Sequence, residues 1–233
     1  MKGTDVPDGE VQVWWASLEL TDSEIESLRR VLSPEEIRRA QRFRVEGAAR
    51  HFIAARAALR SVLGKAVGMD PAEVSFALSE HGKPNLLHGG PCFNASDSGG
   101  FVAIAVTSTE VGIDIELARP LRRRDRLARR ICTSRELEAL VRFPEELRDS
   151  QLLRLWTCKE AALKAIGTGL PGGLRNVEIE LPKIGSPKLV RLVDETDGWT
   201  LLAPDLSPDL LCSAVVRGGD RRVVSRRFSV HST

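Results

Sequence analysis

The groups best suited to chemistry in this sequence are three carboxylates and a lysine in two short segments. In Val111–Glu116, β-branched apolar residues alternate with carboxylates, so a strand would place Asp114 and Glu116 on one face and the isoleucines in a core. Glu160 and Lys164 are spaced to lie one above the other on an alanine-rich helix. If the two faces meet, the carboxylates and the ammonium group would suit Mg²⁺ and a polyphosphate.

The elements that must position these groups are a mixture of helices and strands, which predicts an α/β (α+β) fold. One helix start is well marked, because Ser33 is followed by Pro34 and then by the capping-box glutamate Glu36. Helices are expected at residues 33–43, 48–67, 122–131, 134–143 and 150–166. Strands are expected at residues 11–20, 74–78, 101–107, 111–116, 177–181, 188–193, 200–202, 211–216 and 222–230.

A faint internal repeat organises these elements. Phe52–Arg60 matches Trp156–Lys164 at an offset of 104 residues, and each segment follows a helix that ends in Arg-Phe. We therefore expect two pseudo-symmetric halves, residues 1–109 and 110–233, each a small sheet packed against a long helix. The active site is expected in the cleft between them. At this offset, Arg56 takes the place that the carboxylate of the long helix has in the second half.

The composition excludes several classes of protein. A formal net charge of +2 gives no electrostatic case for nucleic-acid or membrane binding. The N-terminus is polar, and no stretch approaches the roughly 20 apolar residues that span a bilayer, so we expect a cytoplasmic protein without a signal peptide. The four cysteines are far apart and form no CxxC pair, which argues against a zinc site and a disulfide framework. Carboxylates are left as the expected metal ligands.

Two motifs together resemble a known family. Gly112-Ile113-Asp114-Ile115-Glu116, followed by Trp156-x-x-Lys159-Glu160-Ala161-x-x-Lys164-x-x-Gly167-x-Gly169-Leu170, resembles the two-part signature of the 4'-phosphopantetheinyl transferases. The similarity is to their long, surfactin-type (Sfp-like) class. Supporting motifs precede it in order: Leu32-Ser33-Pro34-Glu35, Arg50, Gly82-Lys83-Pro84 and Phe93-Asn94-x-Ser96. The resemblance covers roughly residues 30 to 180.

The resemblance implies a Mg²⁺-dependent transfer of the phosphopantetheine arm of coenzyme A to a serine of an acyl or peptidyl carrier protein, releasing 3',5'-ADP. Asp114, Glu116 and Glu160 match the metal-binding carboxylates. The implied catalytic residues are Asp114, Glu160 and Lys164. Glu160 would be the general base for the serine, and Lys164 would neutralise charge on the transferred phosphate. Such carriers serve fatty-acid, polyketide and nonribosomal peptide synthesis.

The first half is implied to hold the 3'-phosphate and adenine of coenzyme A. Arg50 matches the arginine of the 3'-phosphate, Lys83 and Pro84 match the turn beside the adenine, with Lys83 reaching phosphate, and Ser96 matches a phosphate-contacting serine. Asp114, Glu160 and Lys164 complete the implied coenzyme A set. One position departs from the family, since Asp97 stands where a histidine is usual. An anion beside a pyrophosphate costs on the order of 1 kcal/mol, unless it contacts the metal or a ribose hydroxyl instead.

The arginine-rich run from Arg122 to Arg130 is the densest charge cluster in the chain. It fits either a solvated helix face or a docking surface for an acidic carrier-protein helix, since charged patches steer encounter. No aromatic residues are interleaved to stack on bases, which argues against nucleic acid. A monomer is expected, because the second half supplies the partner that a half-length relative obtains by trimerising.

Two alternatives stay open at this stage. The chain could be a degenerate transferase that binds a carrier protein or nucleotide without catalysis, with Asp97 marking the lost activity. It could also be another Mg²⁺-polyphosphate enzyme, such as a nucleotide hydrolase, although no Walker-type glycine loop occurs in the sequence.

Overall fold

The computed structural model describes residues 6–167, 173–192 and 198–230. In chain order, the first half contains β1 (Glu10–Ser17), α1 (Asp22–Leu28), α2 (Pro34–Ala40), α3 (Glu46–Val67), β2 (Phe76–Leu78), β3 (Pro84–Leu86), β4 (Cys92–Ser98) and β5 (Phe101–Thr107). The second half contains β6 (Val111–Leu117), α4 (Arg124–Ile131), α5 (Ser134–Val141), α6 (Arg148–Ile166), β7 (Val177–Glu180), β8 (Lys188–Leu192), β9 (Trp199–Leu202) and β10 (Leu210–Arg217), and β11 (Arg222–Arg227) follows.

The two halves repeat one topology, which confirms the expected fold class. The strands of the first half are ordered β1-β5-β4 and those of the second β6-β10-β9, and each half adds a hairpin, β2-β3 or β7-β8. The final strand, β11, crosses back and pairs with β1 in parallel, at the edge of the first sheet. The boundary at residues 109 and 110 remains a proposal.

The helix ends correct the offset of the repeat. Both long helices stop at a glycine in the left-handed region, Gly68 at φ 65° and Gly167 at φ 79°. Counted back from these glycines, Ser61 and not Arg56 takes the place of Glu160. The offset of 104 was wrong because alanine-rich helices match one another in several registers.

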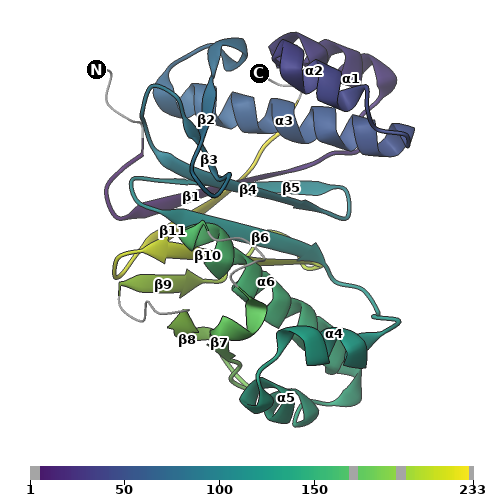
Figure 1. The fold of residues 1–233 in the computed structure, drawn as a ribbon, viewed down its shortest axis with the longest axis vertical. Helices are drawn as coiled ribbons and strands as arrows, with labels where there is room; N and C mark the ends of the chain where they lie inside the picture. The colour runs from purple at the N-terminus through teal and green to yellow at the C-terminus, as the bar shows by residue number, and fades with distance from the viewer. Residues whose placement is uncertain (1–5, 168–172, 193–197, 231–233) are drawn as a thin grey trace.

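Apolar side chains fill three layers. Residues of β1 and β5 meet those of β6 and β10 between the sheets, among them the fully buried Ile113 and Ile115. The opposite face of the first sheet is covered by α3, and that of the second by α6 (Figure 1). The isoleucines therefore lie in the core as predicted, and Asp114 lies on the side of α6.

Three of the labelled helices and strands were missing from the sequence-based prediction: α1, the short strand β3 and β4. Helix α1 begins at the capping box of Thr21 and Glu24, which is a readable signal. Strand β4 has polar residues at every second position and so does not have the apolar alternation of an ordinary buried strand. No helix within the described ranges is long and apolar enough to cross a membrane.

Candidate active site

The site lies along the edge of β6 that faces β4, where the two halves of the chain meet. The other edge of β6 is paired with β10. Towards β4, the Asn94 side-chain oxygen accepts the backbone N–H of Ile113 at 2.9 Å. The Ser96 hydroxyl donates to Asp114 Oδ1 at 2.7 Å, and Ser98 donates to Glu116 Oε2 at 2.8 Å. Polar side chains of one half thus bind the candidate catalytic strand of the other, and we call this contact the seam.

Lys164 is brought to the seam by helix α6. Its Nζ donates to Asp114 Oδ1 at 2.6 Å, to Ser96 Oγ at 3.0 Å and to the Ile113 carbonyl at 3.2 Å. Asp114 is buried, and burial raises the pKa of its carboxyl, partly opposed by Lys164. The structure therefore brings Asp114 of the acidic strand and Lys164 of the helix together, as the sequence predicted for these two faces, and places Ser96 of β4 beside them.

Gly112 allows α6 to approach so closely. A β-carbon at this residue would lie 2.1 Å from the Ala161 carbonyl oxygen and 2.3 Å from the Ala165 amide nitrogen. Only glycine fits a strand at this distance from a helix backbone. The glycine of the first motif thus sets how far Lys164 and Glu160 lie from the carboxylates of β6.

Glu160 and Asp114 each carry a buried oxygen that lacks a hydrogen-bond partner in the described part of the chain. Glu160 Oε1 and Asp114 Oδ2 are both buried and have no hydrogen-bond partner within the described residues. Burial, and then the nearby Asp114, raise the pKa of Glu160. Unpaired buried carboxylate oxygens are costly, and oxygen ligands of this kind suit a hard divalent cation. These two residues therefore fit the predicted magnesium.

Glu116 is placed differently from the other two carboxylates. Its carboxylate accepts hydrogen bonds from Ser98 and, at 2.8 Å, from Arg119, so it is already engaged in this structure. The described residues hold no preassembled group of three or more His, Cys, Asp or Glu that could bind a metal. A role for Glu116 as a metal ligand remains a proposal and would require it to exchange these partners.

A pocket of about 520 Å³ lies beside the seam, between α3 and β4. Two predicted residues, Pro84 and Asp97, line it, and Asp97 is exposed on the strand face opposite Asp114. Arg39 and His51 also line it, and sequence reasoning did not select them as site residues. His51 directly follows Arg50 in the sequence, and this adjacency was the signal that could have pointed to it as a site residue.

Arg50 and Lys83 make contacts within the protein. Arg50 donates to the Leu20 carbonyl at 2.6 Å and pairs with Asp22, beside a separate depression. The Lys83 amine donates to the carbonyls of Val111 at 2.9 Å and Ala165 at 2.8 Å, and its burial lowers its pKa. Lys83 therefore connects the β2–β3 hairpin to β6 and to the last turn of α6. In these positions both side chains are held by protein groups, so contacts with coenzyme A would require them to move.

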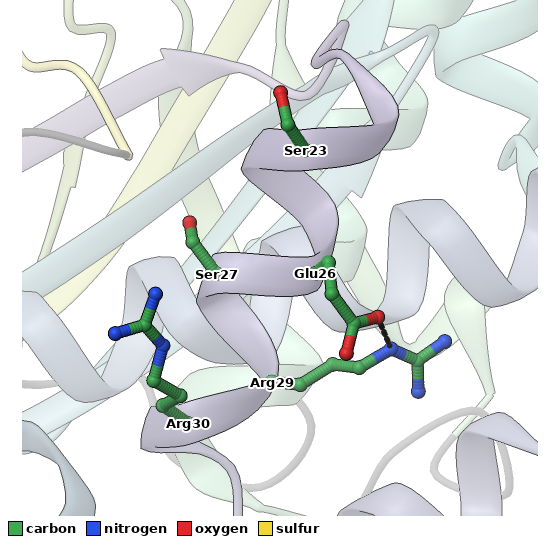
Figure 2. Close-up of a pocket in the computed structure, with 5 residues that line it drawn as sticks. All are labelled: Ser23, Glu26, Ser27, Arg29 and Arg30. Atoms are coloured by element: carbon green, nitrogen blue, oxygen red, sulfur yellow. Dashed lines mark ion pairs between the residues drawn. The ribbon is translucent and has the colours of Figure 1, made fainter.

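Another surface depression lies on α1 and the turn that follows it. Figure 2 shows its lining residues, with an ion pair of 2.8 Å between Glu26 and Arg29. These side chains are polar but hold no paired carboxylates, and the depression lies on the outer helix of the first half. It is not the candidate active site.

A buried ion pair supports the helix that carries Glu160. Lys159 Nζ lies 2.8 Å from Glu136 and donates to the carbonyls of Leu174 and Val177. Glu136 also closes the capping box of α5. The first half repeats the arrangement, where Glu36 caps α2 and binds Arg60, which donates to carbonyls of residues 71–74. Counted from the terminal glycines, Arg60 and Lys159 are equivalent, so the motif lysine supports the fold through a buried ion pair and hydrogen bonds.

The remaining motif residues were Gly169 and Leu170, which lie outside the described residues, and Trp156, which packs at the margin of the core of the second half.

Comparison with known proteins identifies the family. The profile of the 4'-phosphopantetheinyl transferase superfamily matches residues 110–214, and that of the 4'-phosphopantetheinyl transferase N-terminal region matches residues 15–109. The 4'-phosphopantetheinyl transferase HetI of Nostoc sp. is 38% identical over 212 residues, which cover 89% of this chain and 86% of that protein. A Bacillus subtilis 4'-phosphopantetheinyl transferase is 30% identical, covering 82% and 89%. Sfp of Bacillus subtilis is 27% identical with the same coverage. The chain belongs to the 4'-phosphopantetheinyl transferase family, in its two-part, Sfp-like class of enzymes.

Proposed function

We propose that this enzyme transfers the 4'-phosphopantetheine arm of coenzyme A to a serine of a carrier protein in a Mg²⁺-dependent reaction that releases 3',5'-ADP. The observation that carries the proposal is the pair of unpartnered buried oxygens, Asp114 Oδ2 and Glu160 Oε1, beside the Lys164 ammonium. An acidic pair next to a fixed cation suits a bound metal and a pyrophosphate, and a solvated surface ion pair would not leave buried oxygens unpaired.

Asp114 and Glu160 would hold the magnesium, with Glu116 as a third ligand. When bound, Mg²⁺ would neutralise charge on the pyrophosphate oxygens. Lys164 and Ser96 present an ammonium group and a hydroxyl at the same point, and so would orient the phosphate that is transferred. Glu160 would accept the proton of the attacking serine, either directly or through a water, because its raised pKa favours proton uptake.

Coenzyme A would extend from the seam into the neighbouring pocket. Pro84 would pack against the adenine, and Arg39 and His51 line the same pocket with groups that can bind phosphate. Asp97 would accept hydrogen bonds from a ribose hydroxyl, since it faces the pocket and not the metal site. Arg50 would reach the 3'-phosphate only by leaving Asp22, and Lys83 would reach phosphate only by leaving two carbonyls.

The carrier protein would dock on the arginine-rich face of α4 and the turn before it. Arg122, Arg123, Arg126 and Arg130 are exposed, and within the described part of the chain they form no ion pair. An acidic helix of a carrier protein is the complementary surface. We also propose that the enzyme is a cytoplasmic monomer.

Intact-mass spectrometry of an apo carrier protein with coenzyme A and Mg²⁺ tests the reaction. We expect the carrier to gain one phosphopantetheine, and EDTA should abolish the gain. Glu160→Gln and Asp114→Asn should remain folded and inactive, whereas the matched control Glu138→Gln, on the exposed side of α5, should be active. No gain with several fatty-acid and peptide-synthase carriers would refute the proposal and favour a binding protein without catalysis. Asp97→His would then test whether the anion in the pocket is the cause.

A further inference from the structure

The backbone of Lys83 is anchored in the first half without help from its side chain. In the β2–β3 hairpin, the Lys83 N–H donates to the Ser79 hydroxyl at 3.0 Å, and the Lys83 carbonyl accepts the Ser79 N–H at 2.8 Å. Phe76 of the same hairpin meets Phe93 of β4 edge-on, with ring centroids 5.7 Å apart. The hairpin, with Pro84 on the pocket wall, is therefore held by contacts that do not involve the Lys83 amine.

The side chain of Lys83 crosses from this hairpin to the end of α6. Its aliphatic part passes over the helix terminus, where a β-carbon at Gly167 would lie 3.7 Å from the Lys83 Cδ atom. Its ammonium group donates to the carbonyl of Ala165, which lies in the last turn of α6. Carbonyls of a last helical turn lack donors within the helix, and a cation suits the negative end of the helix dipole. Lys83 thus acts as a cap that comes from the other half of the chain.

The second acceptor of the Lys83 ammonium lies on the edge of β6 that faces β4. On this edge Lys164 donates to the Ile113 carbonyl, and the Asn94 side chain accepts the Ile113 N–H. The Val111 carbonyl, which Lys83 binds, comes two residues earlier and so points to the same side, about 7 Å along the strand. Buried backbone carbonyls need donors, and here two ammonium groups supply them at successive positions of one strand edge.

The two carbonyls that Lys83 binds flank the closest approach of β6 to α6. Gly112 directly follows Val111, and a β-carbon at Gly112 would lie 2.3 Å from the Ala165 amide nitrogen. Lys164 directly precedes Ala165. The ammonium of Lys83 therefore joins strand and helix at the point that sets how far the helix lysine is from the acidic strand.

We propose that Lys83 is a positioning residue of the transferase: it clamps β6 to the last turn of α6 and so holds Lys164 beside Asp114. This role rests on the proposed function, and it replaces the phosphate contact that the family resemblance implies for Lys83. Val111 and Ala165 are both buried, so an amine that turned to a phosphate would remove a donor from two buried carbonyls. Because the clamp acts through Lys164, its loss should slow the transfer and leave the binding of the nucleotide part of coenzyme A intact.

Lys83→Met separates the clamp from a phosphate contact, because methionine keeps an apolar chain of similar length and lacks the ammonium group. Calorimetry should give the affinity of 3',5'-ADP, and carrier-protein loading at saturating coenzyme A should give kcat. We expect an unchanged 3',5'-ADP affinity and a kcat lowered by about 10-fold or more, as for misplaced catalytic groups. Loss of a phosphate ligand would instead weaken 3',5'-ADP binding. Lys188→Met, an exposed lysine on the hairpin of the second half, is the matched control and should change neither quantity.

Lys83→Arg provides a second variant with the opposite bias. A guanidinium group binds any phosphate well, but its planar fork cannot place one nitrogen on both carbonyls as an ammonium group does. We expect this variant to be slow as well, and it decides the question if the methionine variant does not fold in urea unfolding. Wild-type kcat per folded Lys83→Met, weakened 3',5'-ADP binding, or full activity of Lys83→Arg would overturn the clamp. A wild type that loads no carrier would instead refute the proposed function, and the positioning role with it.

Discussion

Replacing Gly112 by alanine tests whether the approach of β6 to α6 sets the geometry of the site. The new β-carbon would lie 2.1 Å from a backbone oxygen of α6, so the helix must retreat by roughly 1 Å to restore ordinary contact. Overpacking of this kind costs about 1–3 kcal/mol of stability. A displacement of about 1 Å between catalytic groups costs on the order of 100-fold in rate. We expect both losses, because Glu160 and Lys164 move with the helix while Asp114 stays on the strand.

Two separate measurements test this prediction. Urea unfolding gives the stability, and carrier-protein loading at saturating coenzyme A gives the rate. Gly219→Ala is the matched control, since its β-carbon would meet no atom within 4 Å and should change neither quantity. Loss of stability without loss of rate would mean that the helix repacks and the site does not depend on its distance from β6. A Gly112→Ala variant with wild-type stability and rate would refute the close contact itself.

Further predictions concern single side chains. Ser96→Ala should keep the fold but lower kcat by about 10-fold or more, because hydrogen bonds to charged groups are worth about 1.5–3 kcal/mol; an unchanged kcat in the loading assay would remove the hydroxyl from the mechanism. Burial tends to raise the pKa of Glu36, but Arg56, the Ser33 N–H and Arg60 together lower it. Its stabilisation is therefore present above the ordinary carboxyl pKa and lost as pH falls through the folded value, so Glu36→Gln should flatten the acid limb of stability measured by urea unfolding across pH. Glu136→Gln should cost about 3–5 kcal/mol by leaving the Lys159 ammonium buried and unpaired; a second change, Lys159→Met, should restore part of it, and additive losses would contradict the pairing.

The acidic strand and its partner helix could be predicted because their signals are local. The alternation in Val111–Glu116 determines which face of the strand carries Asp114. The spacing of Glu160 and Lys164 places both on one face of the helix. Only the contact between these two faces depends on the tertiary fold. The capping box at Ser33 was also readable, and the structure confirms it with both hydrogen bonds.

The parts that could not be predicted depend on contacts between distant segments. Strand β4 is polar at alternate residues because Asn94, Ser96 and Ser98 face another strand instead of a core, and no local pattern announces this. The position of Arg39 and His51 in one pocket appears only when α2, α3 and β4 are brought together. Likewise, the sequence gives no sign that the Lys83 amine is held by carbonyls of the second half.

The pairing of β1 with β11 has a consequence for how the chain folds during synthesis. Residues 10–17 leave the ribosome early, yet their parallel neighbour is residues 222–227, roughly two hundred residues later. Closing so long a loop is slow. The face of β1 that carries Val11 and Val13 also stays exposed until β6 and β10 are synthesised and cover it. The first half is therefore completed after the second, so a nascent chain shorter than β11 holds an open strand edge that is prone to pair with other chains.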